Sequence, residues 1–253
     1  MGEFDRLAIE RIRATRPAFK EIVTASYPVT SFGDPEGARV LTVGINPSID
    51  EFHSRKQGRP VLEPGKKRFV DAETLGLKPG TSLTEEAAKI VLEGNKNYFS
   101  GASANPYSWF KSLALYTLQP VGASYHQGTA AHVDLVQWAT DPVWSLIYDG
   151  DVGKALIKSD IEFLRELFTL KTWDLIIING SLAIDTLVEF GILEVETSEI
   201  RKIHEKSRTF VTGKINESKA IGFSVNLPNP WTSAITRHFI ADWITRTTIG
   251  LTP

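Results

Sequence analysis

The sequence predicts an α/β fold, in which a mostly parallel sheet lies between two layers of helices. Val40–Val43 is a short apolar run that ends at Gly44, and Trp173–Ile178 is an apolar run without alternation. Such runs are typical of strands that are buried on both faces of a parallel sheet. Helical patterns separate the strands along the chain, and strands that alternate with helices form a sheet covered on both faces.

The first half of the chain contains helices around one strand. Phe4–Thr15 carries an apolar stripe at helical spacing, and Pro17 suits the first turn of a second, short helix. Thr30–Gly37 is expected to be a loop. Ser82–Glu85 has the pattern of a capping box and opens a helix that Gly94 would end.

The second half supplies the remaining strands. Turn residues, apolar periodicity and capping residues mark the bounds of these elements. The expected elements are a helix after Pro106, a strand over Ala131–Trp138, a helix capped by Asp160 and ending at Leu170, the strand Trp173–Ile178, a helix with Ser181 as N-cap, a hairpin or flap over Arg201–Lys219, a last strand Ile221–Val225 and a closing helix Ile235–Ile244.

Composition limits the class of protein. The 253 residues suit one domain over 1–253, with an N-terminal helical extension at 1–36 and insertions at 53–98 and 195–220. The chain has no cysteine, which excludes disulfides, thiolate metal sites and a cysteine nucleophile. No stretch approaches the about 20 apolar residues of a membrane span, and the charged N-terminus lacks a signal core. We therefore expect a cytoplasmic protein that does not enter membranes.

The stretch Leu41–Asp50 is the first candidate site. Gly44 permits close approach of a ligand to the backbone, and Pro47 ends the strand and keeps Asn46 extended. Ligands of open α/β sheets bind at the carboxyl ends of strands. Asn46 is therefore aimed at a ligand, unless Asn46-Pro47 is merely a turn after a core strand.

The segment from His53 to Arg68 is strongly basic. Six cations, Arg55, Lys56, Arg59, Lys66, Lys67 and Arg68, stand against Glu63 alone, which leaves a charge of +5. It is either a solvated loop or a flap in which Lys66, Lys67 and Arg68 contact phosphates. Farther on, Tyr98 and Phe99 are candidates for stacking on a flat ligand, whereas Trp109 and Phe110 are expected in the core.

Two Asn-Pro turns follow the first and the last predicted strand. They lie at Asn46 and Asn229. The carboxyl ends of parallel strands meet at one edge of a sheet, so both turns could line the same edge. None of the five histidines lies in either turn, and His132 and His238 are expected to be packed or capping residues. We expect no metal and no cofactor.

Five short motifs give this pattern a family resemblance. GINPS at Gly44–Ser48 and LPNP at Leu227–Pro230 resemble the signature motifs of the mismatch-specific uracil/thymine-DNA glycosylases, a branch of the uracil-DNA glycosylase superfamily. Ser108–Lys111, His132–Thr140 and Ile178–Ala183 resemble further stretches of that family, in the same order. The resemblance covers about Val40 to Arg237.

The resemblance implies a three-layer α/β/α domain that flips a base out of double-stranded DNA and hydrolyses its N-glycosidic bond. Asn46 matches the asparagine that positions the attacking water, and the second motif matches the loop that fills the gap left by the base. The base pocket would comprise Gly44, Ile45, Pro47, Ser48, Tyr98, Phe99 and Asp134. The wedge and the DNA-backbone contacts would comprise Asn229, Pro230, Trp231, Thr232, Ser233 and Arg237, together with Lys66, Lys67 and Arg68.

The chemistry agrees with these residues. Uracil can leave with the negative charge if backbone donors near Ile45 and Tyr98–Phe99 stabilise it, so no metal is needed. An amide cannot act as a general base at neutral pH, so Asn46 would hold water and turnover would be slow. Asp50 and Asp134 could act as the base, or could cap a turn and accept a hydrogen bond at the end of a strand.

The sequence leaves other functions open. The segment between the first motif and Ser108 is longer than in compact members of the family, and the second motif continues as Trp231-Thr232-Ser233. A DNA-repair hydrolase that acts as a monomer on a damaged or mismatched base is the main hypothesis. A non-catalytic binder of nucleic acid or nucleobase on the same fold, or a hydrolase of free nucleosides, are the alternatives.

Overall fold

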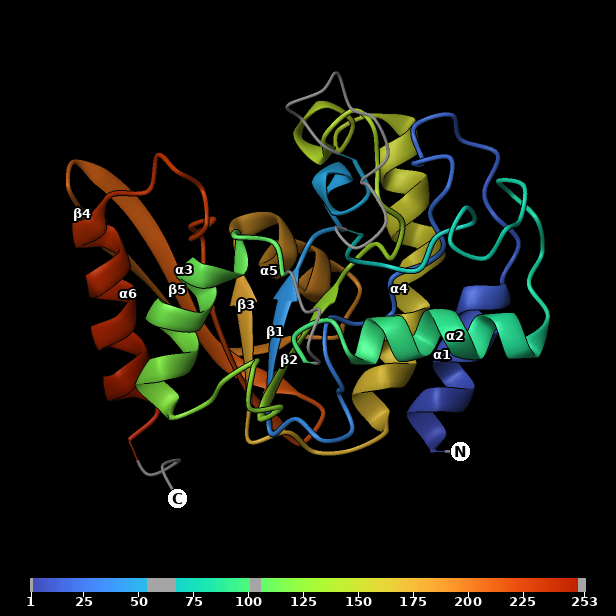
Figure 1. Cartoon of the computed structure of the whole chain (residues 1–253). Coiled ribbons are helices and arrows are strands. Elements are labelled where there is room, and N and C mark those ends of the chain that lie inside the picture. The colour runs from blue at the N-terminus through green and yellow to red at the C-terminus, as the bar shows by residue number, and fades with distance from the viewer. Residues whose placement is uncertain (1, 54–66, 101–105, 250–253) are drawn as a thin grey trace. The chain divides into compact units, whose positions relative to one another are not determined.

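The computed structural model describes residues 2–53, 67–100 and 106–249 (Figure 1). The chain forms two compact units. The first contains Met1–Asp34, Ile45–Tyr107 and Asp134–Leu170, and the second contains Pro35–Gly44, Ser108–Val133 and Lys171–Pro253. Of the helices in the described ranges, none combines the length and the apolar character that crossing a bilayer demands. The prediction of one domain over 1–253 stays a prediction.

A six-stranded sheet organises the second unit (Figure 1). The strands are β1 (Val40–Gly44), β2 (Ala130–Asp134), β3 (Leu175–Asn179), β4 (Glu194–Ile203), β5 (Lys206–Ile215) and β6 (Ser218–Phe223). Their order across the sheet is β2-β1-β3-β6-β5-β4. The centre is parallel, because β3 pairs parallel with both β1 and β6, whereas β5 and β4 add antiparallel strands. The α/β class predicted from the sequence is confirmed.

Helices cover both faces of this sheet. The helices of this unit are α3 (Phe110–Leu113), α5 (Ser181–Glu189) and α6 (Ala234–Thr247). A Cβ on Gly222 of β6 would lie 2.9 Å from Ile184, so that face meets α5. Phe210 of β5 contacts Trp243 of α6, with ring centroids 4.8 Å apart. Phe210 precedes Val211, which pairs with Gly222, and neighbouring residues of a strand point to opposite faces. Helices on both faces are consistent with a three-layer arrangement.

The carboxyl ends of β1, β3 and β6 lie at the same edge of the sheet. The three strands are parallel and end at Gly44, Asn179 and Phe223. Asn179 also fixes the segment after β6, because its Oδ1 accepts a hydrogen bond of 3.0 Å from the backbone N–H of Leu227. The first and last of the predicted strands therefore end at one edge, whereas the placement of the two Asn-Pro turns along that edge stays a prediction.

Three helices form the frame of the first unit. They are α1 (Glu3–Arg13), α2 (Glu85–Lys96) and α4 (Asp151–Thr169), and α1 contacts both of the others. Asp160 of α4 is completely buried, lies 2.6 Å from Nη2 of Arg11 and accepts a hydrogen bond from the backbone N–H of Gln137. The prediction that Asp160 caps a helix is wrong, because α4 begins at Asp151 and Asp160 lies in its interior.

Other predicted bounds also need correction. Residues near Pro17 form no helix. The helix expected to end at Gly94 continues to Lys96, and its N-cap is Thr84, whose side chain accepts from the N–H of Ala87. Gly94 allows the side chain of Val70 to pack closely against α2, because a Cβ on residue 94 would lie only 2.9 Å from that side chain.

Two junctions around the strands differ as well. The second strand ends at Asp134 rather than at Trp138, and residues 135–138 are not a strand. Ser181 is the first residue of α5, and its N-cap is Gly180 at a φ of 104°, a conformation that favours glycine. The hairpin predicted over Arg201–Lys219 is confirmed as β4–β5, although β4 begins earlier, at Glu194.

Candidate functional site

The Asn46 turn lies just beyond β1, at the start of the first unit's second segment. The backbone C=O of Ile45 accepts a hydrogen bond of 2.9 Å from the N–H of Val136. Asn46 is half-buried, and its Nδ2 donates to the backbone C=O of Pro47 and to Oγ1 of Thr140, each at 3.1 Å. The turn therefore holds the asparagine side chain from two sides.

These contacts fix which end of the Asn46 amide is which. A backbone carbonyl oxygen can only accept, so the atom beside Pro47 has to be the NH₂ nitrogen. The other end, Oδ1, receives no hydrogen bond from any residue in the described ranges. The side chain thus offers one acceptor oxygen from a fixed position.

A buried acidic cluster follows the turn. The Oγ of Ser48 accepts from the N–H of Asp50 and begins a 3₁₀ turn over Ile49–Glu51. Both acids of this turn are buried, and Glu51 is only 2% exposed. Asp50 was among the residues predicted from the sequence, but Glu51 was not. The signal that could have revealed it is the pair of adjacent carboxylates that begins two residues after Ser48, a residue able to cap the turn.

Two tyrosines bind these carboxylates. The hydroxyl oxygen of Tyr98 lies 3.0 and 2.8 Å from the two carboxylate oxygens of Glu51 and donates to them. The same hydroxyl accepts the backbone N–H of Tyr107 at 2.9 Å, and the hydroxyl of Tyr107 donates to Asp50 Oδ2 at 2.9 Å. The two tyrosines therefore connect the acidic turn to the chain that precedes α3.

Arg68 completes this group. Its Nη1 donates to the backbone C=O of Asp50 at 2.6 Å, and its Nε lies 3.8 Å from Glu51 Oε2. Its guanidinium lies 5.4 Å from the ring centre of Tyr107. We call Asp50, Glu51, Arg68, Tyr98 and Tyr107 the Glu51 cluster.

Burial controls the charge of the Glu51 cluster. It raises the pKa of Glu51 to about 8, although the hydrogen bond from Tyr98 and the charge of Arg68 both favour the ionised form. The nearby carboxylates Asp134 and Asp50 raise this pKa further. Burial and the neighbouring Glu51 likewise raise the pKa of the Tyr98 hydroxyl. Burial therefore shifts Glu51 toward its protonated form.

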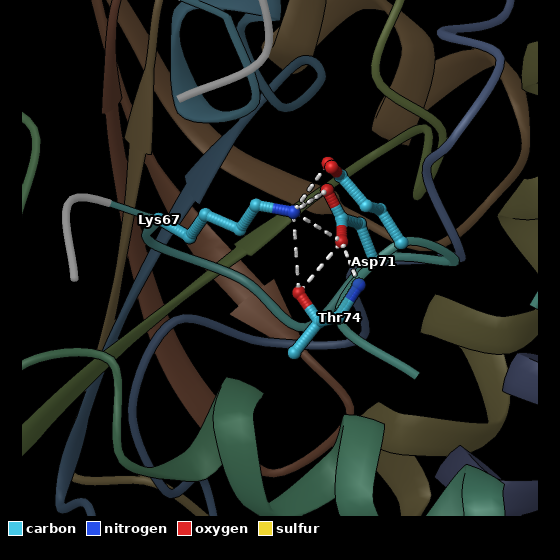
Figure 2. Close-up of polar contacts among 4 residues, drawn as sticks. Lys67, Asp71 and Thr74 are labelled. Atoms are coloured by element: carbon cyan, nitrogen blue, oxygen red, sulfur yellow. Dashed lines mark hydrogen bonds and ion pairs between the residues drawn. The ribbon is translucent and has the colours of Figure 1, made fainter. Parts of the chain in front are cut away.

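Lys67, predicted to contact phosphates, has acidic partners within its own unit. Figure 2 shows its ammonium group reaching Asp71 and Thr74. Nζ lies 2.9 and 3.0 Å from the two oxygens of Asp71 and 2.9 Å from Glu73 Oε2. Burial lowers the pKa of Lys67, but the hydrogen bonds to Glu73 and Asp71 outweigh it, and the net shift is upward. Lys66 and most of the predicted basic flap lie outside the described residues.

The predicted stacking residues are packed inside the first unit. Tyr98 and Phe99 are each 4% exposed. The Tyr98 ring lies 4.9 Å from the ring centres of both Phe32 and Phe69. Asp134, the last residue of β2, is also buried.

The aromatic residues expected in the core belong to the second unit. Phe110 is buried, as predicted, and Trp109 is half-buried. Both rings contact His132, whose Nδ1 lies 2.7 Å from Thr42 Oγ1. His132 is therefore a packed residue, as the sequence predicted. His238 Nδ1 lies 2.8 Å from the backbone C=O of Ala234, within its own helix. In the described part of the chain, no three His, Cys, Asp or Glu residues are grouped so that they could hold a metal ion.

The second Asn-Pro turn belongs to the second unit. Asn229 Oδ1 accepts the backbone N–H of Trp231 at 2.9 Å, so the asparagine closes its own loop. Arg237 Nη2 donates to the backbone C=O of Asn229 at 3.1 Å, and Thr232 Oγ1 donates to the C=O of Asn226. Ser233 caps α6 by accepting from the N–H of Thr236. The next residue of this loop after Pro230 is Trp231, which is 90% exposed.

The predicted site residues are thus divided between the units. Ile45 to Ser48, Tyr98, Phe99 and Asp134 belong to the first unit, whereas Gly44 and the loop of Asn229 belong to the second. Their meeting around one slot stays a prediction. No protein-family model matches this chain, and no curated protein matches it either. The family resemblance rests on its five motifs.

Proposed function

We propose that this protein is a DNA glycosylase that flips a uracil or a related deaminated or mismatched base from double-stranded DNA and hydrolyses its N-glycosidic bond. The proposal has two supports. One is the motif resemblance, with GINPS after the first strand and LPNP after the last. The other is the geometry of the Asn46 side chain.

The observation that carries the proposal is the fixed orientation of Asn46. Thr140 and Pro47 both hold its amide nitrogen, which leaves Oδ1 to accept a hydrogen bond from a water molecule. A water held in this way keeps a lone pair for attack on carbon. Fixing a nucleophile in line supplies a large part of catalysis, because its orientation is no longer lost to thermal motion.

The reaction needs no redox partner. The water oxygen forms a bond to the sugar C1′ while the C1′–N bond breaks. The electron pair of the broken C1′–N bond leaves with the base. One water proton is lost to solvent and the base later takes up a proton. An asparagine cannot take the proton itself, so the anionic base has to be stabilised by hydrogen-bond donors such as backbone amides near Ile45. Because Asn46 takes no proton and hydrogen-bond donors stabilise the departing anion, this mechanism favours bases that leave easily as anions, of which uracil is one.

The loop of Asn229 supports the DNA part of the proposal. Base flipping costs a few kcal/mol and is easiest at a mispaired or damaged base. Trp231 is an exposed aromatic residue on a loop held by Asn229, Arg237 and Thr232, and such a residue can stack in the gap that the base leaves. A rigid loop loses little entropy when its tip enters the duplex.

The experiment is a single-turnover assay on duplexes that carry different lesion bases, including G·U and G·T pairs, followed by alkaline scission at abasic sites. We expect abasic product from a uracil duplex with wild-type protein and none with Asn46→Ala. No product from any lesion would end the enzyme proposal. Salt-sensitive binding without product would favour the non-catalytic binder, and activity on free nucleosides alone would favour the nucleoside hydrolase.

A further inference from the structure

The outer edge of the sheet in the second unit is formed by a long exposed strand. β4 is the last strand in the order β2-β1-β3-β6-β5-β4, so within the described ranges only β5 pairs with it. Its residues are largely exposed, and Ile200, in its second half, is 71% exposed. Exposed edges of this kind are templates for pairing with another strand, and proteins usually blunt them.

The hydrogen bonds of β5 reveal which groups of β4 point outward. Thr209 pairs with Ile200, yet its N–H donates to Ser224 Oγ and its C=O accepts from the N–H of Ser224, on the side of β6. The Thr209–Ile200 pair is therefore a non-hydrogen-bonded pair of the antiparallel ladder. It follows that the N–H and C=O of Ile200 point to the open edge, as do those of Ser198 and Lys202 by alternation.

The charges along β4 specify the partner. Glu199 and Arg201 lie on either side of Ile200 and form an ion pair of 2.6 Å with each other. Both side chains are substantially exposed, so this pair is available to a second strand. A second copy of β4 in antiparallel orientation, with Ile200 opposite Ile200, would set each Glu199 directly opposite an Arg201 of the other copy.

We propose that two copies of this chain associate through their β4 edges, antiparallel and with the two-fold axis at Ile200, so that the two sheets become one. About six backbone hydrogen bonds would link Ile200 with Ile200 and Ser198 with Lys202 of the other copy. The interface is isologous, as in most homodimers. This dimer differs from the monomer expected from the sequence and is independent of the proposed glycosylase activity.

Neighbouring registers are less favourable. An axis at Glu199 or Arg201 would set two like charges opposite each other, and an axis at Lys202 would do the same. An axis at Ser198 would run the pairing into the register shift between Val195 and Thr197. A bulge of this kind interrupts a ladder. The regular stretch from Thr197 to Ile203 therefore favours the register at Ile200 alone.

The first test uses the absence of cysteine from the chain. In Ile200→Cys the two thiols would face each other across the axis, with Cα atoms about 5.5 Å apart, within the range of a disulfide. Mild oxidation should give a covalent dimer. The matched control is Ser198→Cys, on the same face of β4 and also exposed, whose two copies would lie about 14 Å apart. Equal cross-linking of both variants, or none of Ile200→Cys, would overturn the proposal.

The second test exchanges charges and measures association by sedimentation up to about 1 mM protein, because an interface of one strand pair is small and the dimer weak. Glu199→Arg and Arg201→Glu should each raise the dissociation constant about tenfold, since like charges then face each other. The double variant should return it to within about threefold of wild type. A wild-type protein that stays monomeric throughout, or a double variant no better than the singles, would contradict the register. Circular dichroism checks that each variant is folded.

Discussion

The two Asn-Pro turns use the same dipeptide in opposite ways. Asn46 gives its amide nitrogen to Thr140 and Pro47 and keeps its oxygen available, whereas Asn229 gives its oxygen to the N–H of Trp231. The first turn therefore presents a polar acceptor, and the second presents an apolar ring. Under the proposed function, the first turn would position water and the second would contact DNA.

The surroundings of the turns differ in the same sense. The Asn46 turn continues into the buried Glu51 cluster, which is polar and titratable. The Asn229 turn is held by hydrogen bonds from Arg237 and Thr232 and ends at a helix cap. A site that positions water needs rigid polar groups around it, whereas a loop that enters a partner needs to be held only where it joins the rest of the fold.

The largest contrast should come from replacing each asparagine by alanine. Asn46→Ala should lower single-turnover cleavage of a uracil duplex about 100- to 1,000-fold, the range for losing one positioned group in an active site. Asn229→Ala, at a residue that is also half-buried and precedes a proline, is the matched control and should lower cleavage by less than about tenfold. Equal losses in the two variants would show that the turns do not divide the work in this way.

The second prediction concerns the acid beneath the first turn. Glu51 has a pKa of about 8 in the folded protein, above the value of 4.5 expected when it is unfolded. The folded state therefore binds this proton more tightly. Its contribution to stability is fully present below about pH 4.5 and is lost as the pH rises to about 8.

Glu51→Gln tests this linkage. Between about pH 4.5 and pH 8, ionisation of Glu51 should lower the free energy of unfolding of the wild type by roughly 1 kcal/mol per pH unit. The free energy of unfolding of Glu51→Gln should lack this contribution to its pH dependence. Urea unfolding followed by circular dichroism between pH 5 and pH 8 measures it. Glu86→Gln, an exposed acid on α2, is the control and should keep the wild-type slope. A wild-type slope in Glu51→Gln would mean that Glu51 is ionised in the fold.

The third prediction concerns the exposed ring of the second turn. Trp231→Ala should weaken binding to a uracil duplex about 10- to 100-fold, because stacking on a base contributes about 1–3 kcal/mol. The stability of the protein should hardly change, since the side chain is 90% exposed. Leu146→Ala removes another exposed apolar side chain and should leave binding unchanged. Unaltered affinity of Trp231→Ala would remove the wedge from the proposal.

The sequence was sufficient for the parts of the fold that depend on local pattern. β1 is mostly apolar and β3 begins with four apolar residues, and the turns after them contain glycine or Asn-Pro, so both strands and their common edge could be predicted. The Asn46 turn was found for the same reason. The carbonyl of Pro47 sets the direction of its amide, but the second contact, to Thr140, lies 94 residues away and has no sign in the local pattern.

What could not be predicted depends on residues that meet only in the folded chain. Asp160 resembles a cap in sequence, but Arg11 from α1 makes it a buried partner in mid-helix. Glu51 was missed because its burial depends on Tyr98 and Arg68, which lie far along the chain. A carboxylate far from its partners in sequence carries no local sign of a shifted pKa.

The smallest expected effect concerns Lys67, which the sequence assigned to DNA phosphates. Each phosphate neutralised by a cation contributes about 0.9 to the slope of log affinity against log salt. Lys67 is already paired with Asp71 and Glu73, so we expect Lys67→Gln to change that slope by much less than one unit. The cost should appear in stability instead, because Asp71 is only 2% exposed and loses its cation while keeping the hydrogen bonds from Thr74. Titrations of a uracil duplex at several salt concentrations measure the slope, and urea unfolding measures the stability. A slope reduced by about one unit with unchanged stability would return Lys67 to the DNA interface.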